Sequence, residues 1–365
     1  MEQRHRAVAA CGGIVFIFLA VQVGALALVE PFKEQGHQFV QDTSDPTNSL
    51  LYIGAILVAT AVMLAAFRYG VDGIIRFFIV FSGAYIAWYV FQVLFPPLEV
   101  GGLGTVNVLA YVGALLIFVG LYAYPEWYVI DATGVVMGIG AAGLFGINFG
   151  ILPALVLLTV LAVYDAISVY GTEHMLDLAS GVMDLRVPVV LVVPLSLSYS
   201  FLDAETPEAV AEADEGEEQD ADAATVADGA GDADGHDTPA DDADTAEPSA
   251  DGDDEAGERP GLAERDALFI GLGDAVIPTV LVASAGFFVR DAPSLALPGL
   301  TIPLPAGTAM VGTIAGLVVL LWMVLKGRAH AGLPLLNGGA ISGYLLGALA
   351  SGIPLVEALG LSNFL

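Results

Sequence analysis

Runs of roughly 20 apolar residues recur along the chain, and short polar segments with Pro, Asp or Arg separate them. A helix needs about 20 apolar residues to cross the hydrocarbon core of a bilayer. The pattern therefore predicts an all-α polytopic membrane protein with nine transmembrane helices. We expect these helices at residues 8–29, 50–67, 77–95, 106–124, 129–147, 151–170, 267–289, 306–325 and 334–355.

Two segments depart from this pattern. Residues 187–194 are rich in valine, bracketed by prolines and too short to cross a bilayer, which is typical of a strand or an interfacial segment. Residues 203–258 contain 23 acidic side chains, no Lys or Arg and no aromatic residue. A segment of this composition cannot bury a core, so we expect it to be disordered, either as a solvated linker or as a docking tail.

The negative charge is concentrated in residues 203–258, and the rest of the chain is mostly apolar. The mean hydropathy is +0.75 and the net charge is −30, but the chain outside residues 203–258 carries only 18 acids against 11 bases. Strong acidity with two lysines suits a halophile, because high salt screens the self-repulsion. We expect an N-terminal bundle with six spans (1–186), a strand-like or interfacial segment (187–202), an acidic cytoplasmic loop (203–265) and a C-terminal part with three spans (266–365).

Basic residues predict the orientation, because cytoplasmic loops carry an excess of Lys and Arg. With nine alternating spans and a cytoplasmic N-terminus, nine of the 11 basic residues lie inside, and only Lys33 and Arg290 lie outside. The acidic loop is then cytoplasmic and the C-terminus extracellular. The first apolar run is longer than the core of a signal peptide, which has about 7–15 residues, so we interpret it as a retained span.

Two aspartates lie inside predicted spans, where a carboxylate is costly and therefore a functional-site hypothesis. Asp165 lies eight residues before Glu173, and Asp274 lies eight residues after Asp266. At the helical rise of 1.5 Å per residue, both acids would lie about 12 Å inside the same boundary. The two spans run antiparallel, so this equal depth would allow the two carboxyl groups to meet.

The neighbours of Asp274 favour access to its carboxyl group. Gly271 and Gly273 carry no side chains and would let another backbone approach, although ordinary helix packing explains them too. Pro278 lacks the N–H that would bond the carbonyl of residue 274, so the helix should weaken there.

Two further residues are candidates for the same site. Tyr164 precedes the first aspartate and is a candidate hydrogen-bond partner. Asp131 is the main competing intramembrane acid, either a boundary residue or a supporting or relay group.

Two close carboxylates suit two kinds of chemistry. They share one proton, so the pair can activate water and protonate a peptide carbonyl, as in aspartyl proteases. Paired acids also relay protons or cations in membrane transporters, and the residues alone leave both functions open.

The chain has no His-Glu-x-x-His motif and one cysteine, Cys11, so we expect no metal site, no disulfide and no cofactor.

The motifs around the two aspartates resemble those of the presenilin and signal peptide peptidase family, most closely its archaeal branch. That family has Tyr-Asp in its sixth span and Gly-x-Gly-Asp in its seventh, which correspond here to Tyr164-Asp165 and Gly271-Leu272-Gly273-Asp274. Its third motif is Pro-Ala-Leu before the ninth span. The corresponding stretch here is Ala331-Gly332-Leu333-Pro334, in which Leu333 matches and the Pro and Ala of the motif are replaced by Ala331 and Gly332.

The resemblance implies an intramembrane aspartyl protease with Asp165 and Asp274 as catalytic residues, in a multi-pass protein of the cell membrane. Its partners would be transmembrane helices of substrate proteins and the bilayer, with no nucleic acid. The family's third motif engages substrate, which implies the same role for residues 331–334. A helical substrate must unwind before cleavage, and the edge of the strand-like segment, at Val190 and Val192, could pair with the freed backbone.

Overall fold

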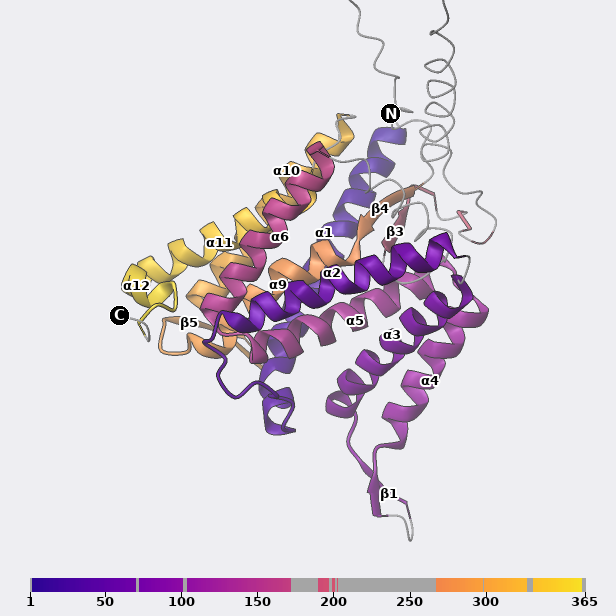
Figure 1. Cartoon of the computed structure of the whole chain (residues 1–365), viewed down its shortest axis with the longest axis horizontal. Helices are drawn as coiled ribbons and strands as arrows, with labels where there is room; N and C mark the ends of the chain where they lie inside the picture. The colour runs from indigo at the N-terminus through magenta and orange to yellow at the C-terminus, as the bar shows by residue number, and fades with distance from the viewer. Residues whose placement is uncertain are drawn as a thin grey trace, which may run out of the picture.

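The computed structural model describes residues 2–69, 72–100, 104–171, 190–196, 199–200, 202, 267–297, 299–326 and 331–362. Helices dominate this part of the chain (Figure 1). They are α1 (Glu2–Glu34), α2 (Thr47–Arg68), α3 (Asp72–Leu94), α4 (Val108–Ala123), α5 (Trp127–Asn148), α6 (Ile151–Gly171), α9 (Leu272–Phe288), α10 (Leu304–Leu325), α11 (Gly332–Ala350) and α12 (Leu355–Ala358).

Each predicted span coincides with one of these helices, apart from shifts at the ends. Seven helices are long and apolar enough to cross a membrane. The helices at the fourth and seventh predicted spans, α4 and α9, are also apolar but have only 16 and 17 residues. The chain is therefore a multi-pass membrane protein. The described residues form ten helices in all, of which α12 is a short addition of four residues.

The seventh predicted span begins too early in the sequence. Its first five residues form strand β4 (Ala267–Gly271), and α9 starts only at Leu272. β4 pairs antiparallel with β3 (Val190–Pro194), which lies within the predicted strand-like segment 187–194 and confirms a strand there. An apolar run of this length does not distinguish a strand from a helix, and the partner strand is distant in the sequence.

Two further antiparallel hairpins connect consecutive helices. β1 (Leu98–Val100) pairs with β2 (Gly104–Val106) between α3 and α4. β5 (Ser294–Leu297) pairs with β6 (Leu300–Pro303) between α9 and α10. The acidic segment that we expect to be disordered lies outside the described residues, so the predicted boundaries of the four parts remain predictions.

Helix α9 lies at the centre of the bundle and contacts α1, α5, α6, α10 and α11 (Figure 1). Most of its residues after Asp274 are buried, including Val280, Leu281 and Val282. The glycines of α5 allow neighbours to approach closely: a methyl group at Gly138 would lie 3.3 Å from Val21 of α1.

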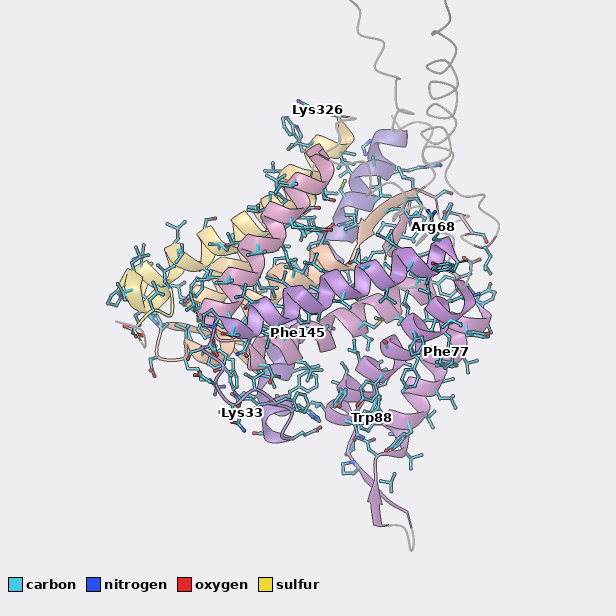
Figure 2. All side chains as sticks on the ribbon, in the orientation of Figure 1. Lys33, Arg68, Phe77, Trp88, Phe145 and Lys326 are labelled. Carbon is cyan, nitrogen blue, oxygen red and sulfur yellow. The ribbon has the colours of Figure 1, made fainter. Side chains whose placement is uncertain are left out.

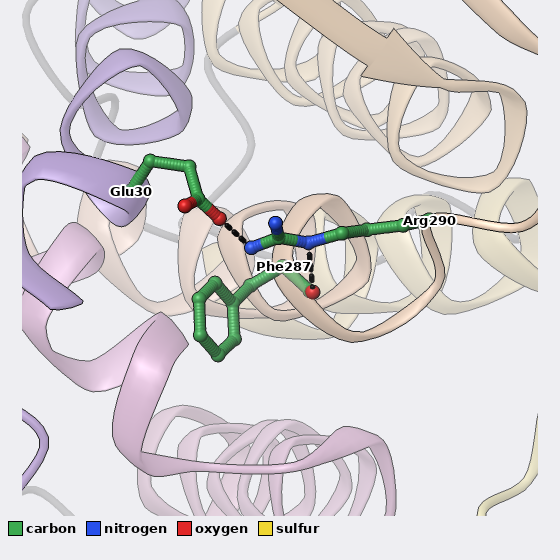
Figure 3. A network of polar contacts seen from close by, with 3 residues as sticks. All are labelled: Glu30, Phe287 and Arg290. Carbon is green, nitrogen blue, oxygen red and sulfur yellow. Dashed lines mark hydrogen bonds and ion pairs between the residues drawn. The ribbon is translucent and has the colours of Figure 1, made fainter. Parts of the chain in front are cut away.

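The opposite end of α9 is tied to α1 by a polar contact (Figure 3). Arg290 forms an ion pair with Glu30, and its Nε donates a hydrogen bond of 2.8 Å to the carbonyl of Phe287. The guanidinium also lies over the Phe287 ring, 4.8 Å from its centroid. Helices α1 and α9 are therefore held together where α9 ends.

Candidate active site

Asp165 lies on α6, six residues before the end of the helix, and its side chain is only 7% exposed. Its Oδ2 accepts a hydrogen bond of 3.0 Å from the backbone N–H of Leu333. Leu333 is the second residue of α11, and the N–H groups of the first helical turn have no partner within the helix. The start of α11 therefore supplies a donor to the first acid.

Asp274 is the third residue of α9, directly after β4, rather than a residue deep inside a helix. A count at 1.5 Å per residue therefore does not give its depth, because a strand rises about 3.3 Å per residue. Its carboxyl group folds back over the turn: a methyl group at Gly271 would lie 3.5 Å from its Oδ2. The N-terminal position also favours a negative charge through the helix dipole.

The structure brings both carboxyl groups to two consecutive residues at the start of α11. Leu333 bonds Asp165, and a methyl group at Gly332 would lie 3.4 Å from Oδ2 of Asp274. The two carboxyl groups are also close enough to interact electrostatically. The segment 331–334, which departs from the family motif, thus contacts both acids, and its residue without a side chain faces Asp274.

Pro278 and Gly273 lie near Asp274 on the same helix, and α9 continues through the proline. Pro278 lies inside α9 and cannot donate to the carbonyl of residue 274. A methyl group at Gly273 would meet only Cδ1 of Ile277, at 3.8 Å, so this side of the turn is open. A polar carbonyl and an uncovered stretch of backbone therefore lie beside the second acid.

The other candidate residues lie around this centre at different distances. Tyr164 is 48% exposed, so its ring points away from the packed interior next to Asp165. Val190 and Val192 lie on β3, which is paired with the strand that leads into Asp274. The backbone N–H of Val192 donates a hydrogen bond of 2.8 Å to Oδ1 of Asp131 on α5. Sequence reasoning identified Asp131 as an intramembrane acid but did not predict this partner.

Asn337 also supports the site, because its Nδ2 donates a hydrogen bond of 2.9 Å to the carbonyl of Leu158 on α6. The side chain is fully buried, and the bond lies one turn of α11 beyond Leu333. The bond fixes α11 against the helix that carries Asp165. An asparagine among apolar residues of a span is a signal that could have identified this contact in the sequence.

Other kinds of site are not supported near the two acids. Among the described residues, no group of three or more His, Cys, Asp or Glu side chains is arranged to hold a metal ion. A cavity of about 690 Å³ lies between α1, α10 and the β5–β6 hairpin, and it is lined mostly by apolar side chains such as Leu19, Leu295 and Val311. None of its lining residues belongs to the candidate site.

Comparison with protein families gives a match over residues 15–353 to the family described as signal-peptide peptidase, presenilin aspartyl protease. The chain belongs to this family. It is therefore an aspartic endopeptidase of the kind that cleaves within membranes. A comparison with curated individual proteins gives no match.

Two solved structures of presenilin family intramembrane aspartate proteases are similar to this family member. The first, in space group C222, is 30% identical, with a TM-score of 0.57, and the match covers 93% of this chain and 99% of that chain. The second, in space group P2, is 31% identical, with a TM-score of 0.54 and coverage of 93% and 97%. Neither the family nor these structures support the transporter alternative.

Proposed function

We propose that this family member hydrolyses peptide bonds within transmembrane helices, with Asp165 and Asp274 as the catalytic pair. The observation that carries the proposal is the position of both carboxyl groups against Gly332 and Leu333. Two acids from helices distant in the sequence have no structural need to converge on one short segment. Their convergence supports a shared chemical task, and the family is one of aspartyl proteases.

The mechanism follows from the proton that the pair shares. Two carboxylates in a site of low dielectric do not both ionise, so one carries the proton. The ionised carboxylate removes a proton from water as the water oxygen attacks the peptide carbonyl carbon, and the protonated one donates to the carbonyl oxygen. When the tetrahedral intermediate collapses, the C–N bond breaks, the amine nitrogen takes a proton from the protonated carboxyl group, and a hydroxyl of the intermediate gives its proton to the ionised carboxylate, so the pair again holds one proton.

The substrate would be a transmembrane helix of another membrane protein. Its scissile bond is enclosed by helical hydrogen bonds and becomes accessible only after local unwinding. The freed N–H and C=O groups then need partners, and the β3–β4 sheet next to Asp274 is the nearest extended backbone. We propose that the substrate adds to the β4 side of this sheet, because the outward N–H of Val192 on β3 is bonded to Asp131, and that Ala331, Gly332 and Pro334 line its path. Val190 and Val192, which the sequence suggests as substrate contacts, would then support β4 from its other side rather than pair with the substrate.

We propose nine spans with a cytoplasmic N-terminus, an extracellular C-terminus and water reaching the pair from the cytoplasmic side. The distribution of basic residues supports this orientation. Arg68 and Lys326 lie toward the end of the molecule that carries the N-terminus and β3–β4, and Lys33 lies at the opposite end (Figure 2). The fourth and seventh spans would be completed by the segments flanking α4 and α9.

A cleavage assay on a model transmembrane peptide tests the proposal. We expect Asp165→Asn and Asp274→Asn each to lower the rate by about 10³-fold or more, because an amide cannot transfer the proton. Both variants should stay folded, and an aspartyl-protease transition-state analogue should inhibit the wild type. Retained cleavage in either variant would remove that residue from the mechanism. Proton or cation flux in liposomes without any cleavage would instead support the transporter.

A further inference from the structure

Asp131 has no place in the reaction described above, yet its carboxyl group makes a specific contact at the edge of the site. It lies in the second turn of α5, and its Oδ1 accepts the hydrogen bond of 2.8 Å from the N–H of Val192. Val192 is the middle residue of β3 and only 1% exposed. A carboxylate is an expensive group to place in a span, so this contact calls for a reason.

The direction of the Val192 N–H explains what the bond does. In an antiparallel pair, alternate residues direct their backbone groups away from the partner strand. Val192 is one of these residues, because its N–H points to Asp131 on α5. Pro194 lies two residues further on and has the same direction, which is the position where a strand tolerates a residue without an N–H. Asp131 thus closes the edge of β3 that faces away from β4.

Helix α5 makes a second contact with β3, one turn after Asp131. Gly134 lies one turn after Asp131, and a methyl group there would lie 2.8 Å from Cδ2 of Leu191 and 3.8 Å from Cδ1 of Leu272. Leu191 is the neighbour of Val192 and is 2% exposed. Asp131 therefore binds the backbone of β3 at Val192, and the side chain of Leu191 packs into the space that Gly134 leaves free.

The contact between α5 and β3 is linked to Asp274 through β4 and the start of α9. Val192 of β3 is the register partner of Phe269 on β4, and β4 runs without a break into α9. Asp274 follows the end of β4 by three residues. A shift of β3 against α5 would therefore move both the sheet and the turn that presents Asp274.

We infer that Asp131 is a positioning residue of the protease: its carboxylate anchors β3 to α5 and thereby holds the sheet and Asp274 in register with each other. The inference rests on the proposed function for its effect on cleavage, but the anchoring itself does not. The role requires a hydrogen-bond acceptor at residue 131 and does not require an ionisable group.

Three variants of the full chain separate this role from acid–base chemistry. Asp131→Asn keeps a carbonyl oxygen at the same place, so we expect kcat/KM within about threefold of the wild type. Asp131→Ala leaves the N–H of Val192 buried without its acceptor, and we expect kcat/KM to fall about 10- to 100-fold. Val192→Pro removes the donor instead, and it should cause a similar loss even if the Asp131→Ala protein does not fold.

The products and the backbone protection give a readout that a loss of stability alone would not change. In Asp131→Ala, mass spectrometry should show cleavage at additional positions, and amides of β3 and β4 should exchange with deuterium faster while those of α10 keep their wild-type exchange, which a general loss of stability would not leave unchanged. The double variant Asp131→Ala/Val192→Pro should lose no more than the worse single variant, because both remove one bond. Asp131→Asn should behave as the wild type in each measurement.

Several results would overturn the inference. If Asp131→Asn were as inactive as Asp165→Asn, residue 131 would act as an acid or base. If Asp131→Ala kept the wild-type rate, products and exchange, the bond would have no role. If the wild type did not cleave at all, the proposed function would fail, but the exchange of β3 and β4 would still decide whether Asp131 anchors the sheet.

Discussion

Two acids of this protein accept a backbone N–H from a distant segment, and the comparison between them is informative. Asp165 accepts from Leu333 at the start of α11, and Asp131 accepts from Val192 within β3. Beside Asp165 lies a second acid, Asp274, whose turn is open at Gly273. Beside Asp131 lies a buried strand that is already paired.

The difference teaches that a buried acid is not by itself a catalytic residue. Both carboxylates are costly in a span, and both are stabilised by a donated N–H. Only the first has a second acid beside it, and the open backbone at Gly273 lies next to that second acid. In the proposed mechanism these two features supply the shared proton and the approach of the substrate. The second has what a structural acceptor needs, which is one well-placed donor on a strand that is already paired.

The largest expected effect concerns the pH dependence of cleavage. A pair of carboxylates that must hold one proton gives a bell-shaped profile of kcat/KM, with a fall of about tenfold per pH unit on either side. We expect the same two limbs in Asp131→Asn, because an acceptor does not titrate in the reaction. Rates measured across the pH range with a model transmembrane peptide test this. A limb that disappears in Asp131→Asn would mean that Asp131 takes part in proton transfer.

The next largest effect concerns the donor to Asp165. Leu333→Pro removes the N–H that binds Oδ2, while a proline in the first turn of α11 leaves the helix intact. Loss of a bond to a charged group should lower kcat/KM about 10- to 100-fold. Leu333→Ala keeps the N–H and controls for the side chain, so its loss should be clearly smaller. Equal losses in the two variants would show that the donor is unimportant.

A smaller effect is expected from filling the space between the acids and α11. Gly332→Val would press a branched side chain against Asp274 and Leu320, and overpacking of this kind should lower the rate about tenfold. Gly332→Ala should lose less than threefold, because its methyl would lie 3.4 Å from the carboxylate. Gly338→Val on the same helix has no neighbour within 4 Å and serves as the control. A rate for Gly332→Val equal to this control would contradict the contact.

Most of the fold could be predicted from the sequence because hydropathy is a local property. Runs such as 50–67 and 306–325 are long enough to leave no alternative to a span. The start of α9 could not be predicted in the same way. Residues 267–271 are apolar in either conformation, and what makes them a strand is a partner at residues 190–194, which are far away in the chain.

The candidate site also contains residues that the sequence predicts and contacts that it does not. Asp165 and Asp274 could be selected from the sequence because an acid in a span is exceptional and both stand in short motifs. The contacts of Leu333 and Asp131 could not be predicted, because each depends on where a backbone N–H points after the chain has folded. Sequence patterns describe side chains and give little information about unpaired backbone donors at helix starts and strand edges.

The smallest effect is expected from the acids that lie in no span. We expect removal of residues 203–258 to change kcat/KM by less than about twofold at high salt. Pro194 and Ala267 are partners in the β3–β4 ladder, so the residues on either side of the removed segment begin next to each other. The eight residues that remain on each side are enough to connect these ends, and shortening a long loop costs little conformational entropy. A replacement by a neutral linker of equal length is the control, and a large loss in the deletion alone would show that length matters. A large loss in both variants would mean that the acidic side chains have a specific task, and the contrast between acids inside and outside the spans would no longer hold.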